Sequence, residues 1–152
     1  MRGGYIKNLW AGKGVKDIQA KAGGIGYIRA LIGDVTKIVS DQDIENIWGG
    51  KNVKDIQASN GSIDNIFASG SVNIIRSNRL SSIFAKADVK DISIMGDINL
   101  IEAMRDAKSI SSQGILEVIA HRDAVGIEGA DGTVFYGRNF SKISDNLSKE
   151  KI

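Results

Sequence analysis

The chain repeats one short pattern of apolar and polar positions fourteen times over residues 6–129. Each unit begins with a branched apolar residue, usually carries an isoleucine three positions later, and carries a small residue five positions later. The segments VKDIQA at Val53–Ala58 and IDNIFA at residues 63–68 are two examples. Ile94 is the only large residue in the small position. A repeat of eight to ten residues is too short for a pair of helices, so the pattern predicts a stack of short strands.

The first apolar position alternates between two series, and this alternation gives the length of one coil. The first series contains Ile6, Ile25, Ile44, Ile63, Leu80, Ile98 and Ile115. The second series contains Val15, Val35, Val53, Val72, Val89, Ala107 and Ala124. Successive members of one series are 17–20 residues apart, so two units make one coil and fourteen units make seven coils.

The side chains of each unit divide between an inner and an outer face. The isoleucine and the small residue are two positions apart, so they share one face of a strand, and the residue between them points outward. The first apolar position also points inward, from across a bend. Gly, Asp, Asn and Ser at the unit boundaries favour turns. We therefore predict an all-β fold, a parallel β-solenoid with two strands per coil, spanning residues 1–129 in a rod about 34 Å long.

The repeat pattern ends after Gly129, where the sequence GADGTVFYGRNF lacks the isoleucine position. The following sequence SKISDNLSKEKI carries Ile143 and Leu147 at helical spacing. Residues 130–152 are therefore expected to form a C-terminal capping segment, part of it helical, that covers the last open strand edge.

The composition removes several classes of function. A net charge of +2, with the basic residues scattered along the chain, argues against nucleic-acid binding. There is no cysteine, which excludes disulfides and cysteine-based zinc sites, and proline is also absent. No apolar run is long enough for membrane insertion, and the N-terminal sequence lacks the apolar core of a secretion signal.

Motifs that carry catalytic chemistry are missing from the chain. There is no Walker loop, HExxH, GxSxG or EF-hand sequence. His121 is the single histidine, and we expect it to be a surface residue rather than a catalyst. The sequence therefore predicts a non-enzymatic protein without a required cofactor.

The outward position between the isoleucine and the small residue collects aromatic side chains on one wall of the rod. In order along the chain this column reads Trp10, Arg29, Trp48, Phe67, Phe84, Glu102 and Ile119. The matching column on the other wall reads Gln19, Val39, Gln57, Arg76, Ser93, Ser111 and Glu128. One wall is thus predicted to be aromatic and the other polar. We call Trp10, Arg29, Trp48, Phe67 and Phe84 the aromatic column.

An exposed apolar patch of this size indicates contact with another molecule. The first interpretation is a protein partner or a homo-oligomer packed face to face on the aromatic column. The second is a carbohydrate-binding or polysaccharide-active wall, since flat aromatic rings stack on sugar rings. Arg29 could serve either role through cation–π contacts. The third is local: the rings shield strand edges, or the C-terminal segment folds over them.

A second column is acidic. Asp88, Asp106 and Asp123 occupy the same turn position on three successive coils. One hypothesis is a calcium ion bridging the coils through these carboxylates. The alternative is that each carboxylate accepts backbone N–H bonds in its turn, helped by Lys90 and Lys108.

On the polar wall, Asp17, Lys37 and Asp55 share one position on successive coils, and their charges alternate in sign. Opposite charges at neighbouring positions of a sheet attract each other. This column is therefore predicted to be structural.

The units GSIDNIFASG and KNVKDIQASNG resemble the I-x-x-I-x-A-x-G solenoid arrays of large bacterial cell-surface, adhesin-like and S-layer-like proteins. The resemblance covers residues 6–129 and rests on the style of the repeat. It implies an extracellular or cell-surface location and a structural or adhesive role as a segment of a longer polypeptide. It transfers no catalytic residues. Pectin-lyase-like β-helix enzymes are broadly similar, but their coils are longer and three-sided.

Overall fold

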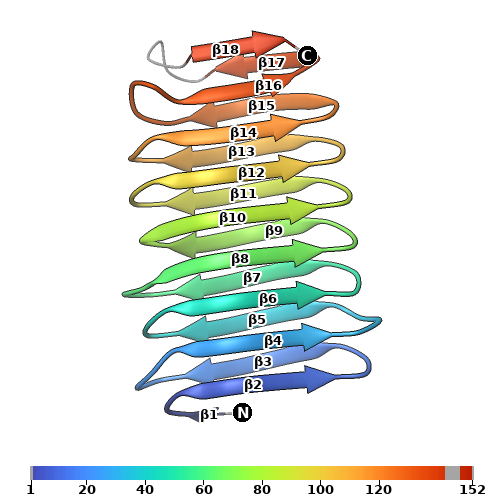
Figure 1. Ribbon diagram of the computed structural model, residues 1–152, viewed down its shortest axis with the longest axis vertical. Coiled ribbons are helices and arrows are strands. Elements are labelled where there is room, and N and C mark those ends of the chain that lie inside the picture. Colours follow the sequence, from blue (N-terminus) through green and yellow to red (C-terminus); the bar gives the residue numbers. More distant parts are fainter. Residues whose placement is uncertain (1, 143–147, 152) are drawn as a thin grey trace.

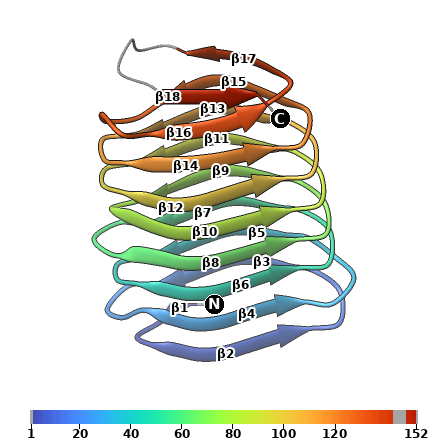
Figure 2. The same ribbon diagram turned by 45° about the horizontal axis from the view of Figure 1, so that its top comes forward.

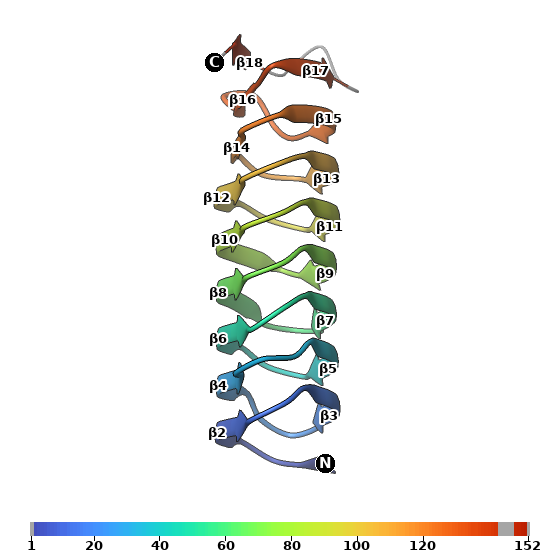
Figure 3. The ribbon, with the colours of Figure 1, turned by 90° about the vertical axis from the view of Figure 1, so that its right-hand side faces the viewer.

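In the computed structural model, which describes residues 2–142 and 148–151, the chain winds into a rod with two parallel β-sheets (Figure 1). Each sheet has nine strands, and successive strands alternate between the two sheets. Seen along the strands, the even-numbered strands form one wall and the odd-numbered strands form the other (Figure 3). The prediction of a two-sided parallel β-solenoid of about seven turns is confirmed.

The odd sheet consists of β1 (Arg2–Gly3), β3 (Val15–Ala20), β5 (Val35–Ser40), β7 (Val53–Ala58), β9 (Val72–Ser77), β11 (Val89–Ile94), β13 (Ala107–Ser112), β15 (Asp123–Glu128) and β17 (Asn139–Lys142). The even sheet consists of β2 (Ile6–Ala11), β4 (Ile25–Ala30), β6 (Ile44–Gly49), β8 (Ser62–Ala68), β10 (Arg79–Ala85), β12 (Ile98–Ala103), β14 (Leu116–Ala120), β16 (Val134–Gly137) and β18 (Ser148–Lys151). Equivalent repeat positions pair in register; for example, Ile47 is opposite Ile66 and Ile66 is opposite Ile83.

The core is the narrow space between the two sheets, and it is filled by the three inward positions of each unit. Ile56 and Ile66 are 1% and 2% exposed, and the small residues Ala58 and Ala68 are buried beside them. Because each coil buries its apolar residues against the coils before and after it, the interior is continuous along the rod.

Both the first and the fourth residue of a unit point inward, which a regular strand does not allow because its side chains alternate. In the odd sheet the third residue of each unit has a left-handed backbone, with φ between 54° and 59° at Asp17, Lys37, Asp55, Ile74, Asp91 and Ser109, and 68° at Gly126. This turns the strand locally and restores the inward direction. In the even sheet the second residue of each unit has no partner in the register of the neighbouring strand, as at Asp64 and Ser81, and the strand bends there instead. These are the bends that the sequence implies.

At the corners, side-chain oxygens of one coil accept hydrogen bonds from the backbone of the next coil. The Asn52 N–H donates to Asp34 Oδ1 over 2.9 Å, and the Ser71 N–H donates to Asn52 Oδ1 over 2.9 Å. At the other corner the Ser62 N–H donates to Asp43 Oδ1 over 2.7 Å. The Asp and Asn residues predicted as turn formers therefore also connect neighbouring coils.

The sequence interpretation differs from the structure at Ile115. Ile115, taken as an inward residue, is 55% exposed, while Leu116 is buried and lies opposite Ile98. The pairing of β12 with β14 shifts register between Ile98 and Ile101, so the inward position moves by one residue.

The ladder also continues beyond Gly129, because β16, β17 and β18 extend both sheets (Figure 2). The helix suggested by Ile143 and Leu147 falls on residues 143–147, which lie outside the described residues. The described residues on either side, in β17 and β18, are strand. The parts of the chain that the structure describes contain no helix, and hence none that is long and apolar enough to cross a membrane.

Candidate interaction surface

The aromatic column lies on the outer face of the even sheet, in register on successive strands. Trp10 is opposite Arg29, Arg29 is opposite Trp48, and Trp48 is opposite Phe67, which is in turn opposite Phe84. The column continues as Glu102, Ile119 and Tyr136. The structure thus brings together all the residues that the sequence assigned to this wall. Tyr136 was missed because it lies beyond the last recognisable repeat.

The three central rings form a parallel stack. The ring centres of Trp48 and Phe67 are 5.8 Å apart with an angle of 5° between the ring planes. The rings of Phe67 and Phe84 are 5.5 Å apart with an angle of 6°. Parallel rings at these distances overlap with an offset, so each ring covers part of the face of its neighbour. The remaining ring surface is partly exposed to solvent.

Arg29 extends the stack toward the N-terminal end of the rod. Its guanidinium carbon lies 4.6 Å from the centre of the Trp48 ring and 5.8 Å from that of Trp10. Its Nε is buried and has no hydrogen-bond partner among the described residues. Trp10 is 71% exposed and contacts Tyr27, with ring centres 6.3 Å apart. The arginine therefore fills the gap between the two tryptophans by cation–π contacts on both sides.

A polar column runs beside the aromatic one and was not recognised in the sequence. Asn65 Nδ2 donates to Asn46 Oδ1 over 3.0 Å, and Ser82 Oγ donates to Asn65 Oδ1 over 2.8 Å. These residues occupy the third position of their units, so the regular spacing of Asn46 and Asn65 was the available signal. The even sheet therefore presents a fixed aromatic column next to a hydrogen-bonded polar one.

His121 lies on the surface, as the sequence suggests, with its side chain 43% exposed. Its Nε2 is 3.0 Å from Glu102 Oε1. Glu102 belongs to the outer column, so the single histidine of the chain lies at the C-terminal side of the same wall.

The acidic column is compensated by cations. Arg122 donates to both carboxylate oxygens of Asp106 over 2.6 Å, and Lys108 Nζ lies 3.1 Å from Oδ2. Asp88 accepts the backbone N–H of Asp106 over 3.2 Å and lies 3.6 Å from Arg105.

These contacts bear on the calcium hypothesis for Asp88, Asp106 and Asp123. Across the residues that the structure describes, no group of three or more His, Cys, Asp or Glu side chains is placed to hold a metal ion. Of the alternative, the lysine neighbours are present, since Lys90 lies 3.7 Å from Asp88 and Lys108 lies 3.1 Å from Asp106. The backbone N–H that Asp88 accepts comes from Asp106 in the next coil rather than from its own turn.

The Asp106–Arg122 pair predicts a pH dependence of stability. The hydrogen bond from Arg122 lowers the pKa of Asp106 well below its usual range, and Lys108 adds to the effect. Since the carboxylate is charged in the folded state and its pKa is lower there than in the unfolded chain, the pair stabilises the fold above about pH 4. That contribution is lost as the pH falls from about 4 toward the folded-state value.

We therefore expect Asp106→Asn to lower the urea midpoint at pH 7 and to reduce the loss of stability between about pH 4 and pH 2. Urea denaturation followed by circular dichroism across this pH range measures both effects. The exposed Asp131→Asn serves as the control for removing a carboxylate. Equal pH profiles for the wild type and Asp106→Asn would contradict the prediction.

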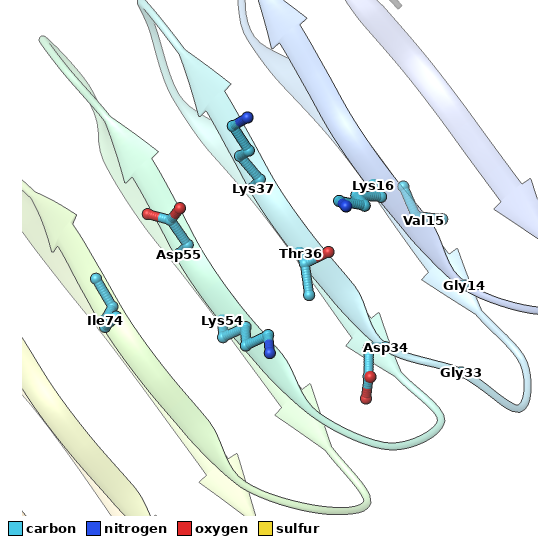
Figure 4. A pocket seen from close by; sticks show the side chains of 10 residues that line it. All are labelled: Gly14, Val15, Lys16, Gly33, Asp34, Thr36, Lys37, Lys54, Asp55 and Ile74. Carbon is cyan, nitrogen blue, oxygen red and sulfur yellow. The ribbon is translucent and has the colours of Figure 1, made fainter.

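The odd sheet carries an open hollow of about 740 Å³ (Figure 4). Lys16, Thr36 and Lys54 come from three successive odd strands and form one side of it, with Lys37 and Asp55 beyond them. Lys37 Nζ lies 3.0 Å from Asp17 Oδ1, which confirms the predicted pairing of these two residues. Three lysines and two aspartates line this hollow, and Lys37 and Asp55 belong to the column that the sequence predicts to be structural.

Comparison of the chain with protein-family models, with curated proteins and with solved structures gives no match. The fold and the surface geometry are therefore the basis for the functional proposal.

Proposed function

We propose that this chain is a non-enzymatic structural module that docks a protein partner through the aromatic column of the even sheet. The observation that carries the proposal is the continuous stack from Trp10 to Phe84 on one face of a regular rod. Tryptophan, tyrosine and arginine are the residues that contribute most binding energy at protein interfaces. The resemblance to surface arrays supports a role within a larger extracellular or cell-surface protein.

The rigidity of the column supports docking. Phe67 is held between two stacked rings, and Trp48, Phe67 and Phe84 lie on strands whose backbones are paired on both sides. Side chains that are already ordered lose little conformational entropy when a partner binds. A flat sheet face with fixed aromatic groups is therefore suited to a partner that is itself a rigid surface.

A glycan remains the second candidate, and the Asn46–Asn65–Ser82 column favours it, because amide and hydroxyl groups beside aromatic rings suit sugar recognition. The offset stacking weighs against it, because Phe67 is covered in part by a ring on each side. Sugar stacking needs a ring face that is accessible from solvent.

The test compares three chains: the wild type, Trp48→Ala with Phe67→Ala, and the matched control Gln57→Ala with Arg76→Ala in the equivalent column of the odd sheet. We expect the wild type and the control to associate with themselves or with a protein identified by mass spectrometry from extracts of the source cells. The aromatic variant should lose this association while its circular dichroism spectrum keeps the strand signal.

Sedimentation velocity and affinity capture measure the association of these three chains. If all three behave alike, the aromatic column is not a docking surface. A panel of glycans titrated against Trp10 and Trp48 fluorescence tests the second candidate, and quenching by a glycan without protein association would replace the proposal.

A further inference from the structure

We infer that the partner of the even sheet is a second copy of this chain, packed face to face with its rod axis antiparallel and with the two-fold axis passing over β8. This inference rests on the proposed function, because it uses the same aromatic column. It goes further by assigning the partner and the register of the contact.

The symmetry follows from the geometry of the sheet. A two-fold axis parallel to the strands turns the even sheet onto itself, preserves the position along each strand, and reverses the order of the coils. Each outward column then faces the same column of the other copy. With the axis over β8, strand β6 faces β10, β4 faces β12, and β2 faces β14.

In this register the outer column is complementary to its own reversed sequence. Phe67 faces Phe67 of the second copy, and Trp48 faces Phe84. Arg29 faces Glu102, whose Oε1 also lies 3.0 Å from His121 Nε2 of its own chain, and two ion pairs form across the interface beside that contact. The Arg29 Nε, which is buried without a hydrogen-bond partner among the described residues, would then lie near a carboxylate. Trp10, the most exposed aromatic ring of the column, faces Ile119.

The neighbouring columns match in the same register. Asn46 faces Ser82, and Asn65 faces itself, which pairs amide and hydroxyl groups with one another. Tyr27 faces the partly exposed Leu100. The polar column thus meets polar groups along its centre and an aromatic–aliphatic contact toward each end.

The edges of the sheet also match. The exposed residues Leu31 and Met104, at 49% and 42%, face each other in the turns that follow β4 and β12. Tyr5 and Ile115, at 59% and 55%, face each other at the opposite edge. The register therefore covers four of the large exposed apolar side chains with one another.

Charges select this register over its two neighbours. If the axis lay between β8 and β10, Arg29 would face Ile119 and Trp48 would face Glu102; if it lay between β6 and β8, Arg29 would face Phe84 and Trp10 would face Glu102. In both cases the Glu102 carboxylate packs against an aromatic ring instead of facing a guanidinium, at a cost. With the axis over β8, Lys7 also faces Glu117, both of which are exposed in the single copy. The unfavourable contacts are Asp64, which faces its own copy, and Lys13, which faces Arg122 in the turns that follow β2 and β14.

The area is sufficient for a dimer. Six residues per strand and seven strands give a face of about 20 Å by 34 Å. That is roughly 650 Å² per copy and 1,300 Å² in total, within the range of specific interfaces.

A charge-exchange experiment tests the inference. Arg29→Glu and Glu102→Arg should each weaken self-association about tenfold or more, because each homodimer then holds two like-charged contacts. An equimolar mixture of the two variants should restore a dimer, since both contacts between the two different chains again join opposite charges. Within one chain these residues are four coils apart, so restoration cannot arise inside a single copy.

Lys7→Glu mixed with Glu117→Lys gives a second test, independent of the arginine that packs between the tryptophans. Sedimentation equilibrium of each variant and of each mixture provides the dissociation constants, with circular dichroism as the check on folding. Restoration in the mixtures supports the antiparallel register, whereas a dimer whose mixtures show no restoration for either pair overturns it.

A wild type that stays monomeric to millimolar concentration overturns the second-copy inference. The proposed function would still stand in that case if the Trp48→Ala, Phe67→Ala variant loses a different protein partner that the odd-sheet control retains.

Discussion

Replacing Ile66 with alanine should lower the free energy of unfolding by about 2–5 kcal/mol. Ile66 is 2% exposed and lies in register between Ile47 and Ile83, so the lost side chain leaves a cavity lined by neighbours on both sides. The ladder on each side holds the backbone, so the walls cannot close the gap. Urea denaturation at pH 7, followed by circular dichroism, measures the difference.

Leu9 provides the matched control because it holds the same repeat position in β2, where it is only partly buried. Leu9→Ala should cost less than Ile66→Ala, since stability in a stacked array accumulates from contacts with both neighbouring coils. Equal losses at the two positions would show that the rod does not depend on its central coils in this way.

Replacing Gly50 with alanine should destabilise the chain by about 1–3 kcal/mol, because the added methyl group would overlap the backbone carbonyl of Leu31 in the preceding coil. The backbone cannot move away easily, since the Gly50 N–H donates to the carbonyl of Ala30 over 2.8 Å. Close approach of two main chains is the situation in which only glycine fits.

Gly12 occupies the same turn position in the first coil, and a methyl group there would meet no atom within 4 Å. We expect Gly12→Ala to be neutral within about 0.5 kcal/mol. Thermal and urea unfolding of both variants check the contrast. A Gly50→Ala chain as stable as Gly12→Ala would mean that the coils separate without cost at this corner.

Much of the fold could be predicted because parallel, in-register stacking converts a sequence period into a spatial one. The 17–20-residue spacing between Ile6, Ile25 and Ile44 is the length of one coil, so counting residues already placed them in one column. Ile115 was misassigned for the same reason: the local register shift at Leu116 leaves the period nearly unchanged. The spacing of the repeats therefore cannot show at which residue the strand register shifts by one position.

The backbone conformations at the bends could not be predicted from the sequence. Ile74 holds a left-handed φ of 57°, which a β-branched residue adopts only under constraint. The residue type gives no sign of this conformation, but Asp55 and Asp91, in the same position of the adjacent strands, have the same left-handed backbone. The left-handed conformation is therefore a property of the third position of each odd-sheet unit rather than of isoleucine.

The candidate surface was likewise predictable only in part. The sequence placed Trp48, Phe67 and Phe84 on one wall, and the structure agrees. It did not reveal that the rings overlap in a parallel stack, because ring orientation depends on side-chain rotamers and neighbours. For the acidic column it indicated Lys108 but missed Arg122, whose long side chain reaches Asp106 from the next coil.

The sequence by itself determined the architecture of this protein, namely two strands per coil, about seven turns, an apolar interior and two unlike walls. It could do so because every coil repeats the same contacts, and side-chain alternation then follows from spacing alone. Only the tertiary structure decided where the strands bend, which cations accompany Asp106, and how Arg29 and the aromatic rings stack. Those features depend on dihedral angles and on distances between coils, which a one-dimensional pattern does not contain.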